Sequence, residues 1–127
     1  MKSKFLVLSL LSLSLVACGS KNITSTYNEK IYYRVSQSGG GREFIGFEDD
    51  KLYFVSDITQ RVYTYTSTTK DYVFYKYEYA GNQTIAYLSF SEDYTTLDYK
   101  IDVSIEWKTF NLDKENIYSL NDLKKRL

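Results

Sequence analysis

The sequence predicts a mainly β domain, an antiparallel meander of about seven strands that is strongly curved or barrel-like and ends in a short C-terminal helix. From Tyr27 onward the 127-residue chain consists of short runs rich in Tyr, Val, Ile, Phe and Thr, the residues that favour strands. Gly, Asn, Asp and Ser separate these runs, as is typical of turns. The chain contains no proline, so no run is confined to a sheet edge on that ground.

The expected strands follow one another closely enough to form successive hairpins. They are residues 30–35, 43–47, 52–56, 61–67, 72–79, 84–90 and 96–110. The segments between them contain residues that tolerate turn geometry or bond to their own backbone. Those turns are residues 48–51, 68–71, 81–82 and 92–94.

The run at residues 96–110 has the clearest strand pattern. Its apolar positions alternate with polar ones without interruption, which predicts one buried and one solvated face. The alternating apolar residues are Leu97, Tyr99, Ile101, Val103, Ile105 and Trp107. At about 3.4 Å per residue the eleven positions from Leu97 to Trp107 span roughly 37 Å, longer than an ordinary strand. We therefore expect a bend or a bulge within it.

The C-terminus predicts a helix that packs on the sheet. Ser119 and Asp122 have the spacing of a capping box, and apolar residues recur near helical spacing at Ile117, Leu120 and Leu123. The strand at residues 84–90 has apolar residues on both faces, which predicts that something covers its outer face. The C-terminal helix is the candidate for that cover.

The N-terminus has the pattern of an export signal. Lys2 and Lys4 precede an apolar and Ser segment at residues 5–16, which leads into Ala17 and Cys18. This segment is too short to span a bilayer, which requires roughly 20 apolar residues. We expect three parts: a signal peptide at residues 1–17, a tether at residues 18–27, and a single all-β domain with the C-terminal helix at residues 28–127.

Leu15, Val16, Ala17 and Cys18 resemble the lipobox of bacterial lipoproteins. The resemblance implies cleavage between Ala17 and Cys18 and attachment of a lipid to the Cys18 thiol. It places the protein on the extracytoplasmic face of the bacterial cell membrane, or at the outer membrane if the source is Gram-negative. The mature domain loosely resembles small lipocalin-like all-β lipoproteins, and residues 90–97 are similar to the hairpin turns of that group.

Composition narrows the chemistry available to the mature part. Cys18 is the only cysteine and histidine is absent, so no thiolate or imidazole remains for a transition metal or a catalytic pair. We expect no enzyme activity, no metal and no cofactor. Without residues 1–17 the chain carries 14 basic and 16 acidic side chains, which argues against nucleic acid as a partner.

Tyrosine is the most unusual feature of the composition, with 14 residues, all after Cys18. Alternation within the strands places several tyrosines on the same face, and with tryptophan nearby they predict an aromatic concavity for a protein, peptide or glycan ligand. The alternative is that these rings simply pack the sheet. The candidate ligand-binding residues are Tyr63, Tyr65, Tyr75, Tyr77, Tyr79 and Trp107.

Three functions are therefore open. The first is a membrane-anchored, noncatalytic binding module at the cell surface. The second is a structural or assembly subunit of a cell-envelope complex, which docks through its outer face and C-terminal helix. The third is a carboxylate-based glycan hydrolase, which requires two acidic side chains to face each other in a cleft; its candidates are Glu48, Asp49, Asp50, Glu92 and Asp93.

Overall fold

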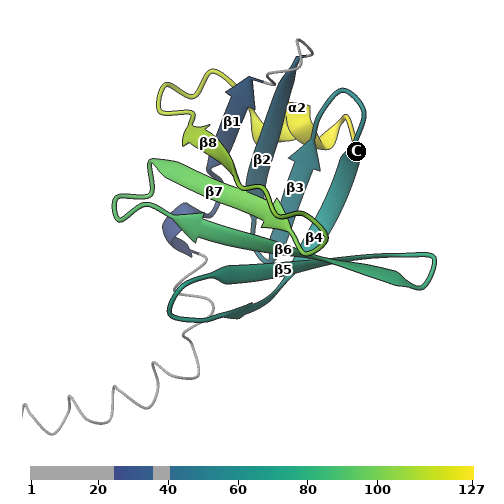
Figure 1. The fold of residues 1–127 in the computed structure, drawn as a ribbon. Coiled ribbons are helices and arrows are strands. Elements are labelled where there is room, and N and C mark those ends of the chain that lie inside the picture. The colour runs from purple at the N-terminus through teal and green to yellow at the C-terminus, as the bar shows by residue number, and fades with distance from the viewer. Residues whose placement is uncertain (1–24, 36–40) are drawn as a thin grey trace, which may run out of the picture.

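A computed structural model describes residues 25–35 and 41–127 (Figure 1). The expected signal peptide, the cleavage site at Ala17, the lipidation site at Cys18 and most of the expected tether lie outside the described residues. Within the described part of the chain, no helix has the length and apolar character needed to cross a membrane.

The domain is a closed antiparallel barrel in which each strand pairs with its neighbours along the chain, confirming the predicted fold class. Strand β8 closes the barrel by pairing with β1 at Tyr32 and Leu112. The chain forms eight strands where about seven were expected. They are β1 (Ile31–Val35), β2 (Arg42–Glu48), β3 (Lys51–Val55), β4 (Gln60–Thr68), β5 (Val73–Tyr79), β6 (Asn82–Phe90), β7 (Thr96–Ile101) and β8 (Lys108–Leu112).

The additional strand arises because residues 96–110 do not form one continuous strand. They form β7 and β8, which pair with each other through the loop at residues 102–107. The backbone amide of Ser104 donates to the carbonyl of Ile101 at 3.0 Å, and this turn reverses the chain. The prediction that Val103 and Ile105 share the buried face was wrong, because they are 83% and 93% exposed on this loop.

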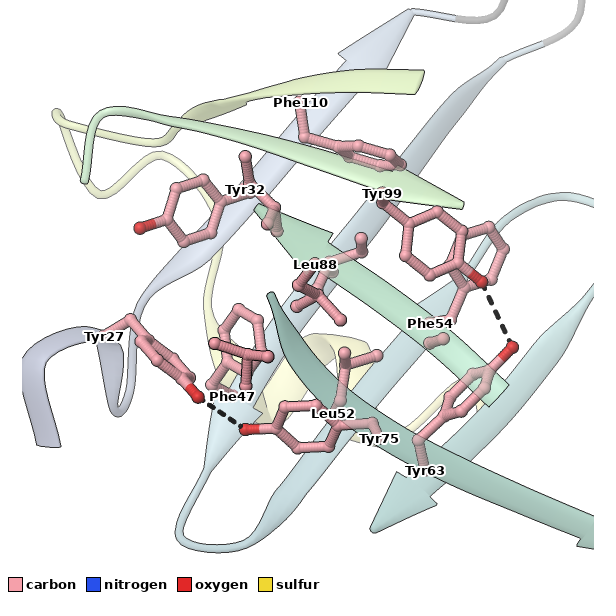
Figure 2. Close-up of a cluster of buried hydrophobic side chains, with 14 residues drawn as sticks. Tyr27, Tyr32, Phe47, Leu52, Phe54, Tyr63, Tyr75, Leu88, Tyr99 and Phe110 are labelled. Atoms are coloured by element: carbon pink, nitrogen blue, oxygen red, sulfur yellow. Dashed lines mark hydrogen bonds between the residues drawn. The ribbon is translucent and has the colours of Figure 1, made fainter. Parts of the chain in front are cut away.

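Aromatic and aliphatic side chains fill the barrel interior (Figure 2). Tyr27, which precedes β1 at the end of the expected tether, is fully buried and closes one end of the barrel. Its ring stacks on Phe90 and meets Phe47 edge-on, with both pairs of ring centroids 4.5 Å apart. Tyr94, on the turn between β6 and β7, packs against Phe90 from the same end. We call this end the closed end.

The C-terminal helix α2 (Leu120–Lys124) begins at the predicted N-cap. Ser119 is the N-cap, and its hydroxyl accepts a hydrogen bond from the amide of Asp122 at 3.1 Å. Leu123 is buried in a cluster on the outer face of the barrel with Phe44 and Val55, which lie on β2 and β3.

The expectation that α2 covers β6 was therefore wrong, and Gly46 on β2 gives a physical reason for its actual position. A Cβ atom at Gly46 would lie 2.9 Å from Leu120 Cδ1 and 3.2 Å from Leu123 Cδ2, so the missing side chain is what lets the helix approach β2. The outer face of β6 is covered by aromatic side chains instead. Tyr87 packs edge-on against Phe74 and Tyr72, with centroids 5.0 and 5.9 Å apart.

Candidate binding site at the open end of the barrel

The end opposite Tyr27 contains a pocket of about 260 Å³. In an antiparallel meander the connections alternate between the two ends, so the β3–β4 and β7–β8 loops lie at the same end, which we call the open end. Both loops contribute to the pocket. It is lined by Glu43, Phe54, Ser56, Ile58, Thr59, Arg61, Tyr63, Tyr99, Lys100, Ile101, Ser104, Glu106 and Lys108.

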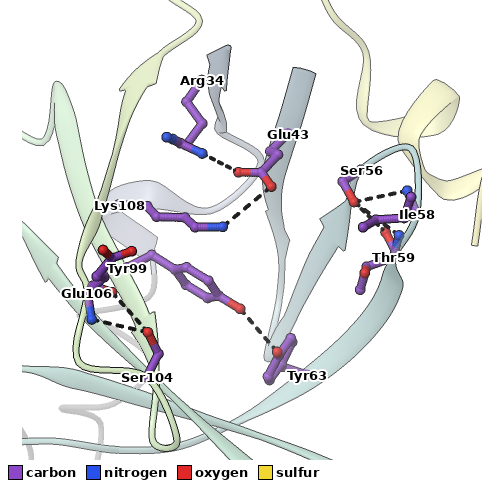
Figure 3. A network of polar contacts seen from close by, with 10 residues as sticks. All are labelled: Arg34, Glu43, Ser56, Ile58, Thr59, Tyr63, Tyr99, Ser104, Glu106 and Lys108. Atoms are coloured by element: carbon purple, nitrogen blue, oxygen red, sulfur yellow. Dashed lines mark hydrogen bonds and ion pairs between the residues drawn. The ribbon is translucent and has the colours of Figure 1, made fainter. Parts of the chain in front are cut away.

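Two tyrosine hydroxyls lie at the inner side of this pocket (Figure 3). Tyr63 projects from β4 and Tyr99 from β7, and their oxygens are 3.1 Å apart. Tyr63 is fully buried and Tyr99 is 6% exposed. Burial raises the pKa of Tyr99, so this hydroxyl remains protonated and able to donate a hydrogen bond. The ring of Phe54 stacks on Tyr99 at 5.3 Å and contributes an apolar wall.

Glu43 is the carboxylate closest to the barrel interior at this end, and two cations neutralise it. Arg34, its cross-strand neighbour on β1, donates to Glu43 at 2.6 Å. The Lys108 ammonium on β8 lies 3.6 Å from the other carboxylate oxygen. The three charges come from neighbouring strands of the closed barrel, so Glu43 carries little unpaired negative charge toward a ligand.

Arg61 places a positive charge on the wall of the pocket opposite Glu43. It donates to the Tyr63 hydroxyl at 3.3 Å, and its guanidinium lies 5.0 Å above the Tyr77 ring. Among the described residues no carboxylate forms an ion pair with Arg61. The hydrogen bond to Tyr63 raises the pKa of Arg61 further above its ordinary value, so the group is cationic at every physiological pH.

Lys100 adds a second cation at the lip of the pocket. Its ammonium lies 4.3 Å from the Tyr87 ring centroid and donates to the Ser104 carbonyl at 3.3 Å. The Lys100 ammonium lies over Tyr87 and Trp107 on the outer face, and Lys108 is paired with Glu43. Arg61 is therefore the cation of the lining that faces the interior without a carboxylate partner among the described residues.

The six aromatic residues chosen from the sequence do not form one surface. Tyr63 lines the pocket, while Tyr65 and Tyr77 are half-buried against the core. Tyr75 is fully buried, and its hydroxyl lies 3.0 Å from that of Tyr27 near the closed end.

The other two candidates lie away from the interior. Tyr79 is 70% exposed at the end of β5. Trp107 lies on the outer face, where its ring stacks on Tyr72 with centroids 5.6 Å apart and Lys100 lies over it. These two residues therefore do not contribute to a shared concavity with Tyr63.

The charged residues of the open end were not among the sequence candidates, although the same alternation contains a signal for them. Arg61, Tyr63 and Tyr65 lie at alternate positions of β4 and point the same way. A charged residue that continues an inward-facing aromatic pattern marks the place where the interior becomes polar. Lys108 stands in the same relation to Phe110 on β8.

The carboxylates considered for glycan hydrolysis belong to two separate hairpins. Glu48, Asp49 and Asp50 lie where β2 turns into β3, and Glu92 and Asp93 lie on the turn between β6 and β7. None of them lines the pocket at the open end, so the arrangement that hydrolysis requires does not occur there.

Two of these carboxylates, Asp93 and Glu48, have structural partners. Asp93 accepts hydrogen bonds from the hydroxyl and amide of Thr95, which lower the pKa of Asp93. Glu48 binds Lys124 of α2 at 2.8 Å, and this bond lowers the pKa of Glu48. Across residues 25–35 and 41–127, no group of three or more acidic or cysteine side chains is placed to hold a metal ion.

Comparisons with family models, with curated proteins and with solved structures gave no match for this chain.

Proposed function

We propose that this protein is a lipid-anchored, noncatalytic binding module of the bacterial cell envelope, and that its ligand site is the open end of the barrel. The observation that carries the binding proposal is the contrast between the two ends. Tyr27 closes one end with packed aromatic rings, whereas the other end holds a pocket lined by polar groups that can still form hydrogen bonds. Small-molecule sites combine apolar walls with a few convergent polar groups in this way.

The size of the pocket limits its ligand. At about 260 Å³ it is slightly smaller than the roughly 300–1,000 Å³ of typical small-molecule sites. A compact molecule, or one end of a longer one, fits this volume. The remainder of a longer ligand would contact the exposed apolar side chains of the two loops, Ile58, Val103 and Ile105.

The binding proposal is tested by mapping a panel of small polar and apolar compounds onto the protein by ¹H–¹⁵N NMR. We expect shift changes to cluster on residues of the pocket, such as Thr59, Ile101 and Ser104. The amides around Tyr27 at the closed end serve as an internal control. The proposal would be contradicted if every compound that binds shifted the amide resonances around Tyr87 on the outer aromatic face and none shifted those of the pocket.

The anchor rests on the resemblance of residues 15–18 to a lipobox, and it has its own test. We expect metabolic labelling with a palmitate analogue in the wild type and no labelling in Cys18→Ala. The variant should also accumulate as a precursor of higher mass, because signal peptidase requires the lipidated cysteine. Equal labelling of the two proteins would contradict attachment of a lipid to Cys18.

The assembly-subunit function remains the alternative. It is favoured by the exposed apolar residues Ile58, Val103 and Ile105 on the β3–β4 and β7–β8 loops, because exposed apolar side chains are typical of a docking surface. Purification from detergent-solubilised membranes separates the two functions, because an obligate subunit returns a partner in fixed stoichiometry. A binding module is recovered alone or with a substoichiometric ligand.

A further inference from the structure

We propose that the open end recognises a carboxylate carried on a compact apolar group, with Arg61 and the Tyr63–Tyr99 hydroxyl pair as the donors. This inference rests on the proposed binding function and names the chemistry of its ligand. It follows from a count of hydrogen-bond donors, from the unpaired cation and from the walls of the pocket.

The hydroxyl pair has one donor more than its neighbours can accept. Tyr63 and Tyr99 together carry two O–H protons, and one of them is shared between the two oxygens. Arg61 approaches Tyr63 as a donor and accepts nothing. Among the described residues no other acceptor binds this pair, so one O–H proton is left to donate to a group in the pocket.

A buried donor without an acceptor destabilises the protein, because it has lost its hydrogen bond to water. Tyr63 and Tyr99 are each more than nine-tenths buried, so the acceptor has to reach them through the pocket. An oxygen that sits there also comes within reach of the Arg61 guanidinium, because that group already touches the Tyr63 hydroxyl. The two donors therefore converge on one position.

The charge of the ligand follows from Arg61. Its guanidinium lines the pocket and has no ion pair among the described side chains. A carboxylate has two oxygens in a plane, so it can accept from a guanidinium and from a hydroxyl at once. The neutralised Glu43 does not oppose it.

The rest of the ligand is apolar. Phe54, Ile58 and Ile101 line the pocket together with the polar groups, and Ile58 is 90% exposed at its edge. A short branched aliphatic or aromatic group attached to the carboxylate would cover these side chains and would be stabilised by the apolar surface that it buries. Two sources offer this chemistry: a free short-chain acid and the C-terminal residue of an apolar peptide.

The test compares acids with their amides, which differ in charge but have nearly the same shape. The first pair is 4-methylpentanoate and 4-methylpentanamide, and the second is N-acetyl-leucine and N-acetyl-leucinamide, which imitates a peptide C-terminus. Binding is followed by the fluorescence of Trp107, the only tryptophan, whose loop lines the pocket, and by calorimetry. The variants are Arg61→Gln and, as a matched control, Arg42→Gln, whose guanidinium lies outside the barrel against Tyr118.

We expect each acid to bind the wild type about 10- to 100-fold more tightly than its amide, the range that follows from a charge-assisted hydrogen bond. Arg61→Gln should reduce that ratio to near one, and Arg42→Gln should preserve it. The tighter of the two acids identifies the source of the carboxylate. Far-UV circular dichroism of Arg61→Gln establishes that the barrel is intact.

Two results would overturn the carboxylate proposal. If the amides bind the wild type as tightly as the acids, the pocket binds ligands without using charge; the proposed binding function then stands and this inference fails. If the acids retain their advantage in Arg61→Gln, Arg61 is not the recognising group. A failure of binding by every compound, together with no mapped shifts at the open end, removes the proposed function itself.

Discussion

The hydroxyl oxygens of Tyr27 and Tyr75 lie 3.0 Å apart inside the barrel, although the residues are 48 positions apart in the chain (Figure 2). Both rings are fully buried, and one hydroxyl donates a hydrogen bond to the other. The pair fastens the segment before β1 to β5 and keeps the closed end shut. The pocket lined by the second tyrosine pair, Tyr63 and Tyr99, opens at the opposite end.

Removing both hydroxyls of this pair should destabilise the protein by less than the sum of removing each one alone. Tyr75→Phe leaves the Tyr27 hydroxyl buried without its partner, which costs about 1–3 kcal/mol of unfolding free energy. The double variant Tyr27→Phe/Tyr75→Phe should cost less than the sum of the single ones. Urea unfolding measures all three, with Tyr79→Phe on the surface as a control within about 0.5 kcal/mol of the wild type. Additive single effects would show that the two hydroxyls do not interact.

Alkaline pH should unfold the barrel. Burial raises the pKa of Tyr27, Tyr32, Tyr75 and Tyr99 above the ordinary value of 10.0. Below pH 10 these groups are neutral in both the folded and the unfolded state. Above it the unfolded state ionises while the folded state does not, so each group lowers the unfolding free energy by about 1.4 kcal/mol per pH unit.

The measurement for this prediction combines tyrosinate absorbance at 295 nm with circular dichroism. We expect a late, cooperative rise in absorbance that coincides with the loss of structure. Tyr75→Phe should show a shallower dependence of stability on pH, because one of the four groups is gone. Complete ionisation of the tyrosines in a barrel that stays folded would contradict the prediction.

The contact of α2 with the barrel should be a measurable part of its stability. Leu123 is buried against Phe44 and Val55, so Leu123→Ala should cost about 2–4 kcal/mol. Leu127, four positions later, is 44% exposed and offers the matched control, for which we expect a much smaller loss. Thermal and urea unfolding compare the two variants, and equal losses would mean that α2 is not held by Leu123.

The curved β meander and the C-terminal helix could be predicted because each depends on a local pattern. Alternation over five to nine residues reports which face of a strand is buried, and the Ser119 cap lies within one turn of the helix. The loop at residues 102–107 could not be separated from its flanking strands in this way. Val103 and Ile105 continue the alternation of β7, and only the pairing of β7 with β8 shows that they leave the sheet.

The candidate site was harder to predict. Alternation shows whether a side chain points into the barrel, but not where along the barrel axis it lies. Tyr63 and Tyr75 both point into the barrel, yet one lines the pocket and the other is buried near the closed end. Their positions along the barrel axis depend on strand register and on which end Tyr27 fills. Arg61 points into the barrel like Tyr63, so the alternation of β4 already indicated a charged residue at this end. The sequence candidates were restricted to aromatic residues and therefore did not include Arg61.

Photo-crosslinking in intact cells tests most directly whether the open end is the binding site. A photoreactive amino acid replaces Ile58, which lines the pocket but is 90% exposed and so tolerates the change. As the control, the photoreactive amino acid replaces Glu92, which lies on the turn between β6 and β7 at the closed end. We predict a discrete adduct from position 58 that is absent from position 92 and is reduced by Arg61→Gln. Adducts of equal yield from the two positions, unchanged by Arg61→Gln, would contradict a ligand site at the open end.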